Sequence, residues 1–185
     1  MSKPIRVSTK TGDKGDSSVI SGERFPKNHP VFEAVGTLDE LNSWLGLVTA
    51  QLATEFGEHK QFLLSVQDNL FYLGAELAQS PKTRLKQSAV NQLEKASDTL
   101  QQLMADDWHH KFLLPGGTVI GANLDIARTV CRRAERAVVS LDGEQRVRPV
   151  VLRYLNRLSD YLYILRCFIN HALEYQEKQF IHQSK

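Results

Sequence analysis

The sequence lacks the features that disulfide, zinc or membrane chemistry would require. Its 185 residues include two cysteines, Cys131 and Cys167, which lie far apart without a Cys-x-x-Cys pair or a Cys/His cluster. We therefore expect reduced core cysteines. No apolar run approaches the length of a membrane span, and the N-terminus shows no apolar signal core. These absences predict a soluble, cytoplasmic protein without a membrane partner.

An excess of charge of one sign is also missing. The 23 basic and 21 acidic residues give a formal net charge of +2, so no global field marks a nucleic-acid binder. No Ser-His-Asp or Cys-His spacing favours nucleophilic catalysis. Without a Glu-x-x-His pair, the ligands of a di-iron helix-bundle site are absent too. Any chemistry must therefore come from local clusters.

Apolar periodicity predicts five helices and no convincing strand. The apolar residues step by three and four, the spacing of amphipathic helices. They are Leu38, Leu41, Leu45, Val48 and Leu52; Leu63, Val66, Leu70, Leu73 and Leu77; Val90, Leu93, Leu100 and Leu103; Leu124, Ala127, Cys131, Ala134, Val138 and Leu141; and Val151, Leu155, Leu158, Leu162, Leu165, Ile169 and Ala172. The first helix begins either near Thr37, where Thr37-Leu38-Asp39-Glu40 has capping-box form, or at Pro30.

This pattern predicts an all-α, antiparallel five-helix bundle in a single domain, residues 1–185. The bundle is expected over 30–175. An irregular arm, residues 1–29, precedes it, and a polar tail, residues 176–185, is expected to fray.

The arm is rich in glycine, lysine and hydroxyl groups. Glycines let backbone N–H groups turn toward an anion, and Lys10, Lys14 and nearby threonines and serines add donors. The composition is that of a phosphate-binding loop, although the spacing is not that of a Walker A motif. The alternative is a flexible polar terminus without a ligand.

Four arginines are concentrated in the fourth predicted helix. Arg128 and Glu135 lie on one flank of its apolar stripe, Arg132 lies further round that side, and Arg133 projects on the other. Arginine offers a permanent charge and a planar fork of donors for phosphate or carboxylate. The cluster therefore indicates a polyanion site. A solvated basic face with pairs to Glu135 is the alternative.

Two further places carry candidate residues. The last helix contains Asn156 and Asp160 one turn apart, and an asparagine amide suits a nucleotide base or ribose; a solvated face with an ordinary surface ion pair is the alternative. Phe112 precedes Leu113-Leu114-Pro115-Gly116-Gly117. It is either a core plug under a turn or an aromatic that projects into a pocket.

Together these segments resemble the PduO-type ATP:cob(I)alamin (corrinoid) adenosyltransferases, from about Ile5 to about Phe168. No single motif is specific, but their order is. The matching segments are Thr9-Lys10-Thr11-Gly12-Asp13-Lys14-Gly15, Gly22-Glu23-Arg24, Lys27, Glu33-Ala34-Val35-Gly36-Thr37-Leu38-Asp39-Glu40-Leu41-Asn42, Leu114-Pro115-Gly116-Gly117, Ala127 to Arg136, and Tyr154-Leu155-Asn156-Arg157-Leu158-Ser159-Asp160-Tyr161-Leu162.

The resemblance implies a trimer with active sites between subunits, and transfer of the 5′-deoxyadenosyl group of ATP to cobalt with triphosphate leaving. It implies ATP contacts from Thr9, Lys10, Thr11, Gly12, Ser17, Ser18, Lys27, Arg132, Arg133, Ala134, Glu135, Arg136 and Asn156. It further implies that Phe112 occupies the lower corrin face, that Asp39 pairs with Arg128 across the subunit boundary, and that Asp160 supports the arginines.

The same resemblance implies ATP, Mg²⁺ and cobalamin as small-molecule partners, the Mg²⁺ ligands being unassigned. A reductase and an adenosylcobalamin-dependent enzyme are possible protein partners. Cob(I)alamin is itself a strong nucleophile, so the protein's tasks are orientation and charge stabilisation. The missing nucleophile motif agrees with this chemistry.

Three residues depart from the family pattern. Asp125 stands where histidine is frequent, Ser21 where glycine is common, and Asp16 adds a negative charge to a loop meant for phosphates. Two other functions stay open on the sequence: an ATP-binding sensor or scaffold, and a non-catalytic corrinoid carrier.

Overall fold

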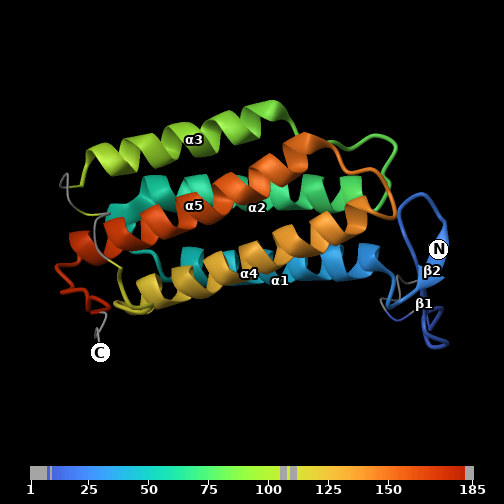
Figure 1. Cartoon of the computed structure of the whole chain (residues 1–185), viewed down its shortest axis with the longest axis horizontal. Coiled ribbons are helices and arrows are strands. Elements are labelled where there is room, and N and C mark those ends of the chain that lie inside the picture. Colours follow the sequence, from blue (N-terminus) through green and yellow to red (C-terminus); the bar gives the residue numbers. More distant parts are fainter. Residues whose placement is uncertain (1–7, 9, 105–107, 109–111, 182–185) are drawn as a thin grey trace, which may run out of the picture.

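The computed structural model describes residues 8, 10–104, 108 and 112–181. Within these ranges the chain forms five α-helices, one short 3-10 helix and one two-stranded sheet. They are β1 (Asp16–Ser18), β2 (Arg24–Pro26), α1 (Pro30–Gln51), η1 (Thr54–Phe56), α2 (Gly57–Leu77), α3 (Gln87–Gln102), α4 (Val119–Asp142) and α5 (Pro149–Ala172). Successive helices run in opposite directions (Figure 1). The predicted antiparallel five-helix bundle is confirmed.

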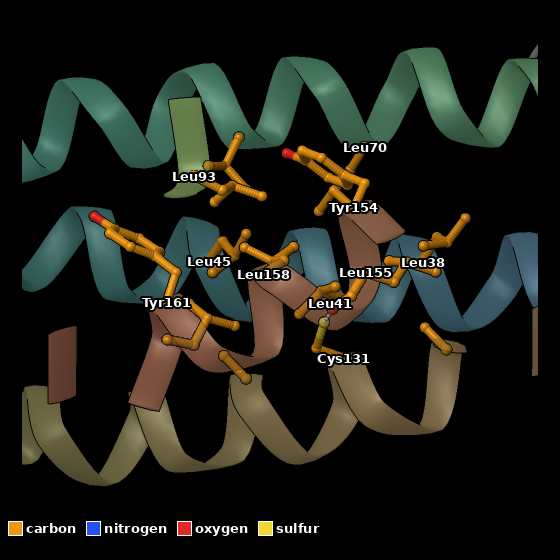
Figure 2. Packing of buried hydrophobic residues seen from close by; sticks show 14 of the residues in the cluster. Leu38, Leu41, Leu45, Leu70, Leu93, Cys131, Tyr154, Leu155, Leu158 and Tyr161 are labelled. Atoms are coloured by element: carbon orange, nitrogen blue, oxygen red, sulfur yellow. Dashed lines mark hydrogen bonds between the residues drawn. The ribbon is translucent and has the colours of Figure 1, made fainter. Parts of the chain in front are cut away.

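The apolar stripes meet in one core. α1 packs against α2 and α4, and α5 packs against α3 and α4. Leucines of α1 and α5 such as Leu41 and Leu158 have no exposed surface (Figure 2), and each contributes roughly 1.5–3 kcal/mol by burial. Cys131 lies among them and donates from Sγ to the carbonyl of Leu155 at 3.3 Å. Both cysteines are free and buried, as predicted, and burial raises the pKa of the Cys131 thiol.

The first helix begins at the earlier of its two possible starts. His29 is the N-cap and accepts from the amide of Val31, and Pro30 occupies the first helical turn. Thr37 lies inside the helix, where its hydroxyl donates to the carbonyl of Glu33 at 2.7 Å. Pro30 and the His29 cap therefore override the capping-box pattern, and Gly36 is carried within α1.

The arm contains a short antiparallel hairpin that its polar sequence does not predict. β1 pairs with β2 in the register Asp16 with Pro26 and Ser18 with Arg24. Val19 is buried, and the amide of Ile20 donates to the carbonyl of Ala78 at the end of α2. This backbone bond, the Ser21–Gln79 side-chain bond and the apolar side chains of Val19 and Phe25 anchor the hairpin to the bundle.

The described part of the tail, which is expected to fray, pairs with the loop before α4. The amide of Leu114 donates to the carbonyl of Lys178 at 2.9 Å, and the amide of Phe180 donates to the carbonyl of Phe112 at 2.7 Å. These bonds flank a β-bridge between Leu113 and Gln179. Pairing with the loop before α4 compensates for the missing apolar stripe; residues 182–185 lie outside the described ranges.

None of the helices in the described ranges has the length and apolar character that crossing a bilayer would require.

Candidate functional site

Exposed arginines of α4 form the first part of the candidate site. Arg132 and Arg136 are exposed, and Arg136 donates to the backbone carbonyl of Arg132 at 3.1 Å. The Arg132 side chain makes no hydrogen bond or ion pair to another residue in the described ranges. Arg133 lies on the opposite flank, as predicted, and pairs with Glu40 of α1. The donors of Arg132 are therefore available to an anion.

A polar contact between α4 and α5 lies beside these arginines. Asn156 is half-buried and donates from Nδ2 to Glu135 Oε1 at 3.3 Å. Its Oδ1 accepts from Arg157, which also bonds Glu94 of α3 and pairs with Asp160 at 3.8 Å. The structure thus brings Glu135 and Asn156 together, and the observed partner of Asp160 is Arg157 of its own helix.

Ala134, predicted among the ATP contacts, is fully buried in the core. Its methyl group helps to pack α4 and has no surface to offer a ligand. The ATP contact expected at Ala134 stays a prediction, and in this structure the residue packs α4 against the core.

The glycine-rich part of the arm folds back on the hairpin. The amide of Lys27 donates to the carbonyl of Gly15 at 2.8 Å, and a side chain at Gly12 would meet the Lys27 ammonium at 3.1 Å. Arg24 donates to the carbonyl of Thr11 and to the hydroxyl of Ser18. Gly12 and Lys27 are therefore neighbours, as a loop around a phosphate chain would need.

The arm contains three more residues that are predicted to contact ATP: Thr9, Lys10 and Ser17. Ser17 is half-buried in β1, and Lys10 is exposed with a left-handed backbone, φ 58°. Thr9 lies outside the described residues.

Phe112 is 84 % exposed. This exposure excludes the core-plug alternative within the described chain. Phe112 lies before the N-terminal end of α4, whereas the arm lies at the opposite end of the bundle (Figure 1). Arg132 is 13 residues into α4, about 20 Å along its axis at 1.5 Å per residue. One chain therefore does not bring Phe112 next to Arg132 or the arm.

Asp39 and Arg128 form no ion pair with each other within the described ranges. Arg128 pairs with Asp125 one turn earlier, at 3.4 Å. Asp39 is exposed and lines a mainly apolar cavity of about 400 Å³ between α1, α2 and the arm. Exposed Ile20 and Phe71 border the same cavity.

A buried polar cluster that the sequence reasoning missed lies under the loop after Phe112. Arg166 of α5 is 2 % exposed and bonds Asp125 and Glu177. Asn170, one turn later, is fully buried and bonds the same loop. The available signal was the position of Arg166, which falls on the apolar stripe of its helix, four residues after Leu162.

No group of three or more His, Cys, Asp or Glu side chains within the described ranges is arranged to hold a metal ion. Side-chain oxygens that could bind a metal ion do occur singly: Glu135 lies beside the arginines of α4, and Asp16 and Ser17 lie in the arm. Such isolated oxygens suit an ion that keeps most of its bonds to water and to phosphate.

Fold and site together define a mainly helical bundle protein with exposed arginines on α4 and a separate loop that carries an exposed aromatic residue. A family model described as cobalamin adenosyltransferase matches residues 7–169. The chain belongs to this family.

Relatives agree over most of the chain. The corrinoid adenosyltransferase PduO of Salmonella typhimurium is 43 % identical over 167 residues, covering 87 % of this chain and 48 % of its own length. The chain thus spans about half the length of this relative. The corrinoid adenosyltransferase of Bacillus subtilis is 39 % identical, covering 90 % of this chain and 87 % of its own length.

Among solved structures, a variant of a PduO-type ATP:corrinoid adenosyltransferase from Lactobacillus reuteri, complexed with cobalamin and ATP, aligns with a TM-score of 0.90. It is 32 % identical, and the alignment covers 96 % of this chain and 100 % of the other.

Proposed function

We propose that this single domain is an ATP:corrinoid adenosyltransferase, a transferase of alkyl groups that converts cob(I)alamin to adenosylcobalamin. The lone pair of Co(I) attacks C5′ of ATP, a Co–C bond forms, and the C5′–O bond breaks. Triphosphate leaves with the electron pair, and cobalt is formally oxidised from +1 to +3. The observation that carries the proposal is the exposed Arg132, whose donors are unused within the described chain, on a helix matched by the family model.

Charge stabilisation is the proposed task of α4. The triphosphate gains charge as it leaves, and preorganised arginine donors lower the barrier most where charge develops. We assign this role to Arg132 and Arg136, with Arg133 at the edge. Glu135 and Asn156 then recognise the nucleoside, because an amide both donates and accepts.

The arm is proposed to wrap the ATP. Lys10, Thr11, Gly12, Ser17, Ser18 and Lys27 supply backbone and side-chain donors, and Thr9 extends this set. The contact between Gly12 and Lys27 supports the assignment, because it directs an ammonium group over a glycine whose backbone is accessible.

Phe112 is proposed to occupy the lower corrin face and keep the axial base away from cobalt. A four-coordinate Co(II) lacks the ligand that raises the energy of the orbital to be filled, so it is easier to reduce. The 84 % exposure of Phe112 supports this role, since an exposed aromatic ring is free to meet a flat apolar ligand.

A homotrimer is the proposed assembly. Arg132 lies about 20 Å along α4 from the helix end that follows Phe112, and this supports the assembly because a second copy can bring the two parts together. In this assembly Asp39 pairs with Arg128 of the neighbouring subunit. Exposed Ile20 and Phe71 beside Asp39 provide the apolar surface that such a contact would bury.

Mg²⁺ is proposed to be bound mainly by triphosphate oxygens and water, with at most a few of the isolated oxygens of the arm or α4. When bound, it would neutralise charge on the leaving group. The proposed location is the cytoplasm, with a reductase and an adenosylcobalamin-dependent enzyme as further partners and without nucleic acid.

The test is spectroscopic. The protein is mixed with Mg²⁺ and chemically reduced cobalamin, in one sample with ATP and in another without it, while the corrinoid spectrum is followed. We expect adenosylcobalamin to form only with ATP. ATP binding without any corrinoid change would identify a nucleotide sensor, and corrinoid binding that ignores ATP would identify a carrier; either result overturns the proposal.

A further inference from the structure

We propose that Arg166, Asp125 and Glu177 form a positioning cluster that fixes the loop carrying Phe112, and that the tail segment 177–180, which bridges to that loop, is part of the cluster. This inference rests on the function proposed for Phe112. It concerns residues that hold the loop from below, not residues that touch a ligand.

Arg166 uses its whole guanidinium group on the loop and on the two carboxylates. Its Nε donates to Asp125 Oδ2 at 3.1 Å, and its Nη1 donates to Glu177 Oε1. Its Nη2 donates to the backbone carbonyls of Leu114 at 2.9 Å and Gly116 at 3.0 Å. A buried arginine with this set of bonds holds its neighbours in place, because removing the guanidinium group would take the counter-charge from two carboxylates and the side-chain donor from the Leu114 carbonyl.

Asn170 completes the grip on the same loop. Its Nδ2 donates to the carbonyl of Gly116 and to Glu177 Oε1 at 2.8 Å, and its Oδ1 accepts from the amide and hydroxyl of Thr118. Gly117 has φ +115°, and a side chain there would overlap the Asn170 amide. The backbone of the loop at Gly117 therefore packs directly against the Asn170 side chain of α5, where a side chain on the loop would not fit.

Glu177 ties the tail to the cluster. The backbone bonds between Leu114 and Lys178 and between Phe112 and Phe180 then fasten the segment ahead of the glycines. An aromatic ring that is 84 % exposed gains little orientation from its own packing. The direction of the Phe112 ring is therefore set by the loop backbone. The tail bonds this backbone at Phe112 and Leu114, and Arg166 bonds it at Leu114 and Gly116.

Asp125 also connects the cluster to α4. Its Oδ2 accepts from Arg166 and from the amide of Gly116 at 2.9 Å, while its Oδ1 accepts from Arg128. Two arginines and two carboxylates balance in charge within this buried group. The loop, the tail and Arg128 are consequently held by one network.

The test compares Glu177→Ala with Glu177→Gln and with Gln176→Ala, a change of the exposed neighbour. Three quantities are measured: the four-coordinate Co(II) signal with saturating ATP, the KM for ATP with pre-reduced cob(I)alamin, and the melting temperature. We expect Glu177→Ala to lower the four-coordinate signal at least fivefold with the KM for ATP within twofold of wild type. Glu177→Gln keeps both acceptor bonds and should recover at least half the signal.

A Glu177→Ala protein with the same four-coordinate signal as Gln176→Ala would overturn the inference. So would a parallel loss of signal and ATP affinity, since a general structural defect lowers both. If Glu177→Ala is unfolded at the assay temperature, the three variants are compared below its melting temperature, and the same outcomes decide the inference.

Amide hydrogen exchange separates this inference from the proposed function. The amides of Leu114, Gly116 and Thr118 should exchange faster in Glu177→Ala than in Gln176→Ala, whether or not the wild-type protein makes adenosylcobalamin. A wild-type protein without transferase activity overturns the proposed function, whereas unchanged exchange at these amides overturns the positioning cluster.

Discussion

Arg132 and Arg166 are the same residue type in opposite situations. Arg132 is exposed on α4 and makes no side-chain bond within the described ranges, whereas Arg166 is buried on α5 and bonds two carboxylates and two carbonyls. The difference lies in which donors are still available. An arginine with unused donors can bind a ligand, and one with all its donors occupied can only hold the structure that presents the ligand site.

The largest expected effect is the loss of stability when the buried Arg166 is replaced. Arg166→Met keeps an apolar side chain at this buried position but removes the ion pair of Glu177 and leaves Asp125 paired with Arg128 alone. We expect a loss of about 3–5 kcal/mol in the free energy of unfolding. Arg132→Met is the matched control and should change it by less than about 0.5 kcal/mol. Denaturant unfolding measures both; similar values for the two variants would contradict the contrast.

The role of the exposed Arg132 is tested by measuring ATP binding and turnover. Arg132→Ala should weaken ATP binding or turnover at sub-saturating ATP by about 1.5–3 kcal/mol, roughly 10–150-fold, because charge-assisted bonds to the triphosphate are lost. Stability should hardly change. Lys82→Ala removes the same charge from an exposed loop and should leave ATP kinetics intact. Wild-type turnover in Arg132→Ala would favour a merely solvated basic face.

A change at Phe112 tests whether the loop that Arg166 holds takes part in the reaction. Phe112→Ala should fold like the wild type, within about 0.5 kcal/mol, because the ring is exposed. Activity should fall about tenfold or more, at least 1.4 kcal/mol, when cobalt must be reduced on the protein. Pre-reduced cob(I)alamin should restore part of it.

Leu103→Ala, a change at another exposed apolar residue, is the control for Phe112→Ala. Early melting of Phe112→Ala, or an unchanged four-coordinate Co(II) signal, would contradict the corrin-facing role.

Arg148 is intermediate between Arg132 and Arg166 in exposure and bonding, and the loss of its ion pair is expected to change stability least. It is about half exposed and bonds Glu76 of α2, whose carboxylate is nearly buried. Burial raises the pKa of Glu76, but bonds from Arg148 and the amide of Leu85 outweigh it, so the pKa is lowered from 4.5. The stabilisation is therefore present above pH 4.5 and is lost as the pH falls through the folded-state value.

Glu76→Gln should accordingly lose on the order of 1 kcal/mol or less at pH 7. The difference from wild type should shrink between pH 6 and pH 3 in thermal melts. A difference that grows toward acid pH would contradict this assignment.

Much of the fold could be predicted because each helix carries its own apolar period. The start of α1 could not be chosen, since Pro30 and Thr37 both offer local signals and packing decides between them. The hairpin was missed because its two strands have three residues each and little apolar alternation. In such segments, contacts with the end of α2 determine the structure.

The candidate site divides in the same way. The exposed arginines were predictable from charge spacing on one helix, and Asn156 from its place on another. The bonds of Arg166 join residues 41 and 11 positions away, so no local pattern contains them. The pairing of Asp39 with Arg128 across a subunit boundary stays a prediction.

The bridge between the loop and the tail also sets an order of events during synthesis. Glu177 leaves the ribosome about 60 residues after Gly116, a delay of roughly 3–12 s at ordinary elongation rates. The arginines of α4 emerge in the first third of that interval, while the segment of Phe112 still lacks the tail residues that bridge to it. The apolar ring is thus the last part of the site to be secured, and it is exposed to chaperones and to premature contacts throughout that time.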